Sequence, residues 1–131
     1  MDWKLEVVVI PVSDVDRAKQ FYAEQVGFAV DHDTRVSDDV RLVQLTPPGS
    51  ACSIVLSKGL GDAPPGSAPS LQLVVPDIDA AHAELAERGV AVSNVQHFEG
   101  GDRVDGRGGD WNSFVFFSDP DGTNWTVQER P

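Results

Sequence analysis

Hydrophobic and polar residues follow one pattern that occurs twice along the chain. Each half begins with a mainly apolar run, at residues 5–10 and 71–74, which is typical of a strand covered on both faces. An acidic motif comes next, Val-Ser-Asp at 12–14 and Val-Pro-Asp at 75–77, whose Asp carboxylate can cap the first turn of a helix. The pattern therefore predicts two copies of a strand–helix unit, each followed by further strands.

Glycines mark where the two predicted helices end. Apolar residues recur at helical spacing over 15–26 after a cap at Ser13 or Asp14, and Gly27 closes this first helix. The second helix is expected over about 77–87, just before Gly89. Further strands are predicted at 28–30, 41–46, 52–57, 90–95, 113–118 and 124–128.

The two halves are expected to form one domain over residues 1–131. The first module covers about 1–58, a linker rich in Gly, Pro, Ala and Ser covers about 59–70, and the second module covers about 71–131. Repeats of this size usually cannot bury their own hydrophobic face, so we expect the function in the groove where the halves meet. The Gly-rich polar stretch 99–110 is expected to be a loop, either a mobile lid or a surface excursion.

The charge of the chain narrows the range of partners. Ten basic and 21 acidic residues give a net charge of −11, whereas nucleic acids and anionic membranes require a positive face, so neither is expected. The same charge favours a cationic ligand. No apolar stretch approaches the roughly 18 residues that span a bilayer, the start lacks a basic and apolar leader, and the single Cys52 suits a reducing compartment. We therefore expect a soluble cytoplasmic protein.

The repeated motifs carry a family resemblance. Val-Ser-Asp-Val-Asp-Arg-Ala at 12–18, Phe21-Tyr22, Gly27-Phe28 and the closing Phe-Ser-Asp-Pro-Asp-Gly at 117–122 resemble the vicinal oxygen chelate superfamily, which groups glyoxalase I, bleomycin resistance proteins and extradiol dioxygenases. The resemblance implies an α+β fold in which two tandem βαβββ modules form curved mixed sheets around a cleft. Because members of the superfamily commonly dimerise, it also implies a homodimer.

The resemblance also indicates where metal-dependent members place their ligands. These positions fall on Val7, on Ser70 or the nearby Gln72, on Thr126 and on Gln44. None of these side chains binds Mg, Mn, Fe, Ni or Zn well, since such ions prefer imidazole or carboxylate. We therefore expect no metal and no other cofactor, and bleomycin-type resistance proteins, which bind a bulky cationic drug, offer a precedent within the family.

A neutral pocket is predicted in place of the metal site. Side chains alternate along a strand, so a cleft-facing Thr126 implies that its neighbours two residues away share its face. Trp111 enters a strand beside polar residues and suits stacking on a planar ligand. The predicted ligand-binding residues are Val7, Val9, Gln44, Ser53, Ser70, Gln72, Trp111, Asn124, Thr126 and Gln128.

These residues favour a metal-independent small-molecule-binding protein, with antibiotic or metabolite sequestration as its role and a small organic ligand as its partner. The alternative is a metal-dependent lyase, isomerase or dioxygenase with atypical ligands. The candidate metal ligands of such an enzyme are His97, Glu99 and Glu129. An H-x-E-x-x-D string is also formed by His97, Glu99 and Asp102. A module that binds another subunit and no ligand is the third possibility. The sequence leaves open whether any catalysis occurs.

Overall fold

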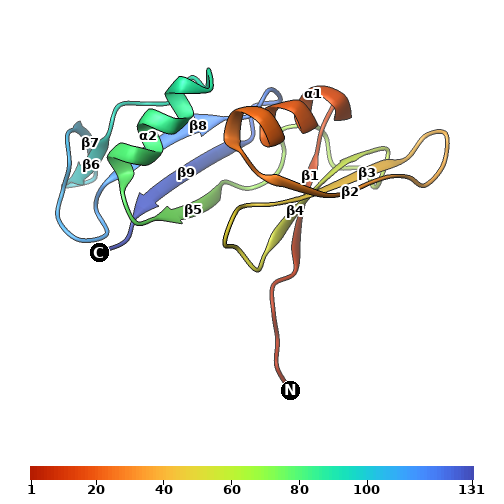
Figure 1. Ribbon diagram of the computed structural model, residues 1–131, viewed down its shortest axis with the longest axis horizontal. Helices are drawn as coiled ribbons and strands as arrows, with labels where there is room; N and C mark the ends of the chain where they lie inside the picture. The colour runs from red at the N-terminus through yellow and green to blue at the C-terminus, as the bar shows by residue number, and fades with distance from the viewer. The chain divides into compact units, whose positions relative to one another are not determined.

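A computed structural model describes residues 1–131 and confirms the predicted mixed α+β fold (Figure 1). The chain divides into two compact units. Unit 1 comprises Met1–Ala68 with Pro120–Gly122, and unit 2 comprises Pro69–Asp119 with Thr123–Pro131. No helix in the chain is long and apolar enough to cross a bilayer.

Unit 1 contains one helical segment and a four-stranded sheet. Its elements are β1 (Val7–Pro11), α1 (Val15–Gln20), a π-helical turn η1 (Phe21–Val26), β2 (Ala29–Arg35), β3 (Arg41–Thr46) and β4 (Ser53–Lys58). The strand order is β1-β4-β3-β2, with β1 and β4 parallel and the other pairs antiparallel. Asp14 caps α1 by accepting a hydrogen bond from the Arg17 amide at 3.0 Å, and Gly27 ends η1 with a φ of 91°.

Unit 2 repeats this plan with one additional strand. Its elements are β5 (Leu71–Val75), α2 (Ile78–Glu87), β6 (Gln96–Glu99), β7 (Asp102–Asp105), β8 (Phe114–Ser118) and β9 (Asn124–Glu129). The order is β5-β9-β8-β6-β7, and β5 and β9 are parallel. Asp77 caps α2 through the Ala80 amide at 3.0 Å, as Asp14 caps α1. The two acidic motifs therefore perform the same local role in both units.

The strand predicted at 90–95 is wrong, because Val90 completes the end of α2 and residues 91–95 form no strand. Gly89 has a φ of 85°, its amide donates to Ala86, and the Val90 amide donates to Leu85 at 3.0 Å. This pair of hydrogen bonds is a Schellman motif, and the buried Val90 seals it. The following strand, β6, starts only at Gln96.

The stretch 99–110 is also not one long loop. Residues 96–105 form the β6–β7 hairpin, in which Glu99 pairs with Asp102. Gly100 and Gly101 make the turn with φ values of 56° and 89°. Two consecutive residues with positive φ match the right-handed twist of a hairpin, and glycine adopts them without steric cost.

One face of each sheet forms the core with its own helix. In unit 1, α1 packs on β3 and β4, where Val43, Leu45 and Leu56 are fully buried. In unit 2, α2 packs on β8 and β9, over the buried Val115 and Val127. Because side chains alternate between the two faces of a strand, the residues between these buried ones lie on the opposite face of each sheet, away from the helix.

Charged side chains join α1 to the edge of the unit 1 sheet. Asp33 on β2 accepts hydrogen bonds from Arg41 at 2.8 and 2.9 Å and from Lys19 at 2.8 Å, and Arg41 also binds Asp16 at 2.7 Å. The hydrogen bonds from Arg41, and then those from Lys19, hold the pKa of Asp33 well below its usual range. The folded state therefore favours the ionised carboxylate.

We expect this network to make stability depend on pH. A lowered pKa in the folded state stabilises the fold above the unfolded Asp pKa of about 3.9, and this contribution is lost as the pH falls through the folded pKa. Asp33→Asn should lower the free energy of unfolding by about 1–2 kcal/mol at neutral pH, and the difference from wild type should shrink below about pH 4. Urea denaturation at a series of pH values measures it.

Asp62→Asn is the matched control, because exposed Asp62 makes no hydrogen bond or ion pair. It should change the free energy of unfolding by less than about 0.5 kcal/mol. A loss for Asp33→Asn that is as large at pH 3 as at pH 7 would contradict the assigned role of the ionised carboxylate.

Candidate functional site

The face of the unit 2 sheet away from α2 brings several predicted residues together. Gln72 on β5 lies opposite Thr126 on β9, and Thr126 in turn lies opposite Phe116 on β8. Cross-strand partners share one face of a sheet, so these three side chains are neighbours. Trp125 and Val127 alternate with them and are buried on the other face.

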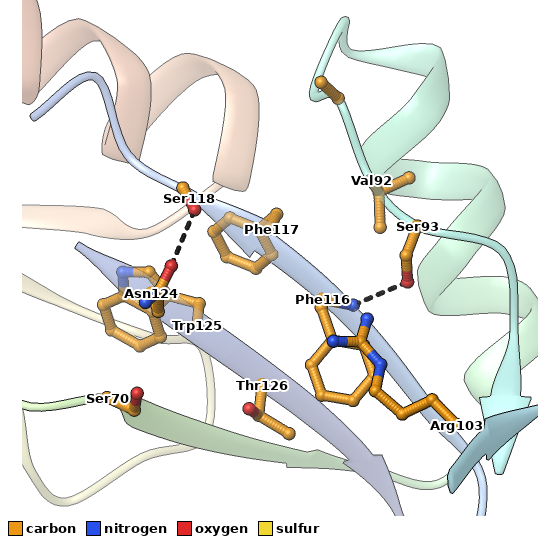
Figure 2. Close-up of a pocket in the computed structure, with 11 residues that line it drawn as sticks. Ser70, Val92, Ser93, Arg103, Phe116, Phe117, Ser118, Asn124, Trp125 and Thr126 are labelled. Atoms are coloured by element: carbon orange, nitrogen blue, oxygen red, sulfur yellow. Dashed lines mark hydrogen bonds between the residues drawn. The ribbon is translucent and has the colours of Figure 1, made fainter. Parts of the chain in front are cut away.

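A pocket of about 790 Å³ lies over this part of unit 2 (Figure 2). Its floor is formed by β8 and β9, one side by the segment after α2, and Arg103 reaches in from β7. The lining residues are Ser70, Ala91, Val92, Ser93, Arg103, Phe116, Phe117, Ser118, Asn124, Trp125 and Thr126. The volume is in the range of sites that bind small organic molecules.

Three of the predicted residues line this pocket: Ser70, Asn124 and Thr126. The Ser118 hydroxyl donates to Asn124 Oδ1 at 2.9 Å, which orients the amide and leaves its Nδ2 available as a donor (Figure 2). The hydroxyls of Ser70 and Thr126 make no hydrogen bond within the protein. The pocket therefore presents neutral donors and acceptors beside aromatic rings.

Three other predicted residues form a hydrogen-bonded chain in unit 2 outside the pocket lining. Gln72 Nε2 donates to Gln128 Oε1 at 2.6 Å, and Gln128 Nε2 donates to the Trp111 carbonyl at 2.8 Å. Trp111 has a φ of 61° and is 52% exposed. A positive φ is unusual for a bulky residue, so this backbone position is strained and the surrounding contacts must hold it.

The segment around Trp111 is fixed by specific hydrogen bonds. Asn112 accepts from the Phe98 amide at 2.9 Å and donates to the Phe98 carbonyl at 3.1 Å. The Gly108 amide donates to Ser113 Oγ at 3.0 Å, and the Gly106 amide donates to the Val95 carbonyl at 2.7 Å. These contacts attach residues 106–113 to Val95 and to Phe98 on β6, so this part of the stretch predicted as a mobile lid or a surface excursion is held to the sheet.

The remaining four predicted residues lie in unit 1. The strand register places Val7 opposite Ser53, and Val9 and Gln44 both opposite Val55, so all four share one sheet face. Ser53 is buried, and its hydroxyl lies 2.6 Å from that of Thr46, which also bonds to Asp31. Val9 is 47% exposed. None of the four lines the unit 2 pocket.

Sequence reasoning missed most of the pocket wall. The sequence predicts a loop at Arg103, which lies on β7, and a strand at residues 91–93, which form none. The Gly-Gly pair at 100–101, flanked by alternating polar and apolar residues, was the available signal for the hairpin. Ser93 had no comparable signal, because it joins the site through the Phe116 amide, which donates to its hydroxyl at 2.9 Å.

Comparison with known proteins identifies the family. The profile of the Glyoxalase/Bleomycin resistance protein/Dioxygenase superfamily matches residues 4–127. The chain belongs to this superfamily. Comparison with curated proteins gave no match.

Solved structures of superfamily proteins agree with this membership. TnmS3, an antibiotic binding protein from Streptomyces sp. CB03234, is 35% identical over 99% of this chain and 98% of its own, with a TM-score of 0.79. A glyoxalase/bleomycin resistance protein from the same strain is 36% identical over 95% and 99%, with a TM-score of 0.74. A superfamily member from Sphaerobacter thermophilus DSM 20745 is 25% identical over 98% of both chains, with a TM-score of 0.71.

The metal positions implied by the superfamily resemblance do not fit a metal ion in this chain. Val7 and Gln44 lie in unit 1, and Ser70, Gln72 and Thr126 lie in unit 2. Their side chains are an alkyl group, two amides and two hydroxyls, which are poor ligands for the ions that the superfamily uses. No group of three or more His, Cys, Asp or Glu side chains in the structure is arranged to hold a metal.

The candidate metal ligands of the enzyme alternative contact neighbouring protein groups. His97 Nδ1 lies 2.8 Å from the Gly106 carbonyl, and its Nε2 lies 3.6 Å from Glu99. Glu129 accepts hydrogen bonds from the Ile78 amide at 2.8 Å and from Arg107 at 2.5 Å. The Ile78 bond, and then the Arg107 bond, lower the pKa of Glu129. In this arrangement Glu129 accepts a hydrogen bond from an otherwise unpaired amide at the N terminus of α2.

Proposed function

We propose that the chain is a metal-independent small-molecule-binding protein of this superfamily, acting by sequestration of an antibiotic or a metabolite. The observation that carries the proposal is the unit 2 pocket, in which Ser70 and Thr126 stand where the superfamily resemblance places metal ligands. Aromatic rings, neutral hydrogen-bonding groups and one arginine, Arg103, surround them. Such a lining suits an organic molecule held by shape and a few hydrogen bonds.

The similarity to TnmS3 supports an antibiotic as the ligand, because that relative is described as an antibiotic binding protein and shares 35% of its residues with this chain. The net charge of −11 supports faster association with cationic compounds. We propose a homodimer in the cytoplasm as the working form, and static light scattering on the purified protein tests the dimer.

The proposed contacts are the ten predicted residues together with the pocket wall. Ser70, Asn124 and Thr126 are proposed to bind ligand directly, and Gln72, Gln128 and Trp111 to border the same sheet face. The proposed ligand contacts on the unit 1 sheet are Val7, Val9, Gln44 and Ser53. Backbone amide shifts in a titration followed by NMR distinguish these groups.

Purified, chelator-free protein is expected to contain far less than one metal ion per chain by elemental mass spectrometry. In a thermal-shift assay with Mg, Mn, Fe, Ni, Zn and a panel of antibiotics, at least one antibiotic should raise the melting temperature. A ligand present at a hundred times its Kd stabilises the fold by about 2.7 kcal/mol. For a domain of this size, that raises the melting temperature by several degrees.

The enzyme alternative predicts a different result in the same assay. Metal near one ion per chain that is lost in His97→Ala would contradict the proposal and favour a metal-dependent lyase, isomerase or dioxygenase. His82→Ala is the matched control, because His82 lies on α2 and outside the pocket. A protein that no antibiotic or metal stabilises would favour the subunit-binding alternative.

A further inference from the structure

Arg103 is the one charged side chain among the residues that line the unit 2 pocket. It extends from β7 over β8, and its Cζ lies 3.7 Å from the centre of the Phe116 ring (Figure 2). A guanidinium at this distance from an aromatic face is held by both stacking and the ring quadrupole. Phe116 itself packs between Phe114 and Phe98, at centroid distances of 6.0 and 6.4 Å.

Hydrogen bonds fix the orientation of the Arg103 side chain. Its Nε and Nη2 donate to Gln96 Oε1 at 3.2 and 2.9 Å, and Gln96 Nε2 donates to Asp105 Oδ1 at 3.0 Å. The Asp105 carboxylate therefore positions Gln96, and Gln96 positions the guanidinium. Asp105 does not line the pocket, so its negative charge is kept away from the ligand space.

Arg103 retains donors that no protein group uses. A guanidinium has five N–H donors, and the two bonds to Gln96 leave three of them, including both on Nη1. Four arginines pair with carboxylates, namely Arg17, Arg41, Arg88 and Arg107, whereas Arg103, like Arg35 and Arg130, makes no ion pair. In a chain with 21 acidic residues, this cation is oriented and has no carboxylate within ion-pair distance.

The pocket therefore has a local charge opposite to that of the whole chain. Its other ten lining residues are neutral. Asp105 lies one amide group away from Arg103, through Gln96, whereas carboxylates beyond a Debye length of about 10 Å at 0.1 M salt are screened. A group at hydrogen-bond distance from Arg103 is nearer to the guanidinium than any of these carboxylates and is screened much less. The bound ligand consequently experiences Arg103 more strongly than it experiences the net charge.

We propose that Arg103 is a specificity-determining residue that selects planar aromatic ligands bearing a carboxylate. This inference rests on the proposed function. The carboxylate accepts from the free edge of the guanidinium, in the fork geometry that suits two oxygens. The aromatic ring lies along the floor beside Phe116 and Thr126, and Asn124 Nδ2 can donate to an acceptor at the far end.

Three naphthalene probes of nearly equal shape test the proposal: naphthalene-2-carboxylate, naphthalene-2-carboxamide and naphthalen-2-ylmethylammonium. Titrations of the ¹⁵N-labelled full chain, followed by NMR, give the Kd and the location of each. We expect the carboxylate to bind about tenfold more tightly than the amide, as a charge-assisted hydrogen-bonded pair provides, and the ammonium to bind most weakly. The amide resonances of Ser93 and Thr126 should shift.

Variants separate the role of Arg103 from that of charge in general. Arg103→Gln should reduce the preference for the carboxylate over the carboxamide to less than about threefold. Arg103→Lys keeps the charge but loses the fork, so it should give an intermediate preference. Arg88→Gln makes the same charge change at the end of α2, outside the pocket, and should retain the full preference.

Tighter binding of the ammonium probe, or a carboxylate preference that persists in Arg103→Gln, would overturn the proposal. If none of the probes shifts the pocket resonances at millimolar concentration while an antibiotic still does, the proposal fails and the binding function stands. If neither the probes nor the antibiotic panel binds, the proposed function itself fails.

Discussion

Replacement of Tyr22 by alanine is expected to lower the free energy of unfolding by about 3–5 kcal/mol. Tyr22 is fully buried in unit 1, where it meets Phe21 edge-on at 5.2 Å and stacks on Phe28 at 5.9 Å. Removing the ring loses apolar burial and leaves a cavity that close-packed neighbours fill only in part. Because the free energy of unfolding of a domain of this size is about 5–15 kcal/mol, the variant loses much of its stability.

Urea denaturation followed by tryptophan fluorescence and circular dichroism measures this loss. Trp3→Ala is the matched aromatic control, because Trp3 is 88% exposed and its removal should change the free energy by less than about 0.5 kcal/mol. A loss below about 1 kcal/mol for Tyr22→Ala would show that the π-helical turn repacks, and would contradict its role as a central core residue.

Thr126→Trp is expected to weaken binding of the antibiotic that gives the largest thermal shift by at least about a hundredfold. Thr126 lies on the pocket floor between Ser70 and Phe116, so an indole at this position occupies ligand space (Figure 2). A hundredfold loss corresponds to about 2.8 kcal/mol, which is reasonable for the exclusion of a ligand ring from its contacts. Isothermal titration calorimetry measures the change.

The fold should tolerate this variant, because tryptophan is common in strands and Thr126 is on the face away from α2. Val36→Trp places the same side chain just after β2 in unit 1, at a position that is 62% exposed and outside the pocket lining. It should bind the antibiotic within about threefold of wild type. Equal losses in both variants would show that an added tryptophan impairs binding without entering this pocket, and unchanged binding in Thr126→Trp would exclude this pocket.

Local chemistry made much of the fold predictable. Asp14 and Asp77 cap helices, and Gly27 and Gly89 end helical segments, because carboxylates bind free amides and glycine accepts positive φ. These effects act between residues close in sequence, so they can be identified from a pattern of letters. The strand predicted at 90–95 is wrong for the same physical reason, since Val90 completes a helix cap that uses the same apolar residues as a strand.

The sequence by itself determined the two repeated units, their caps and turns, and the superfamily. The superfamily resemblance also indicated Ser70 and Thr126, and alternation along the strand from Thr126 added Asn124. Only the tertiary structure decided that Arg103 lies over Phe116 and that Ser93 binds the Phe116 amide. Those contacts depend on hairpin geometry and on strand pairing between residues far apart in the chain. The stability that such packing provides is shared among many neighbouring residues, so no single residue in the sequence indicates the contact.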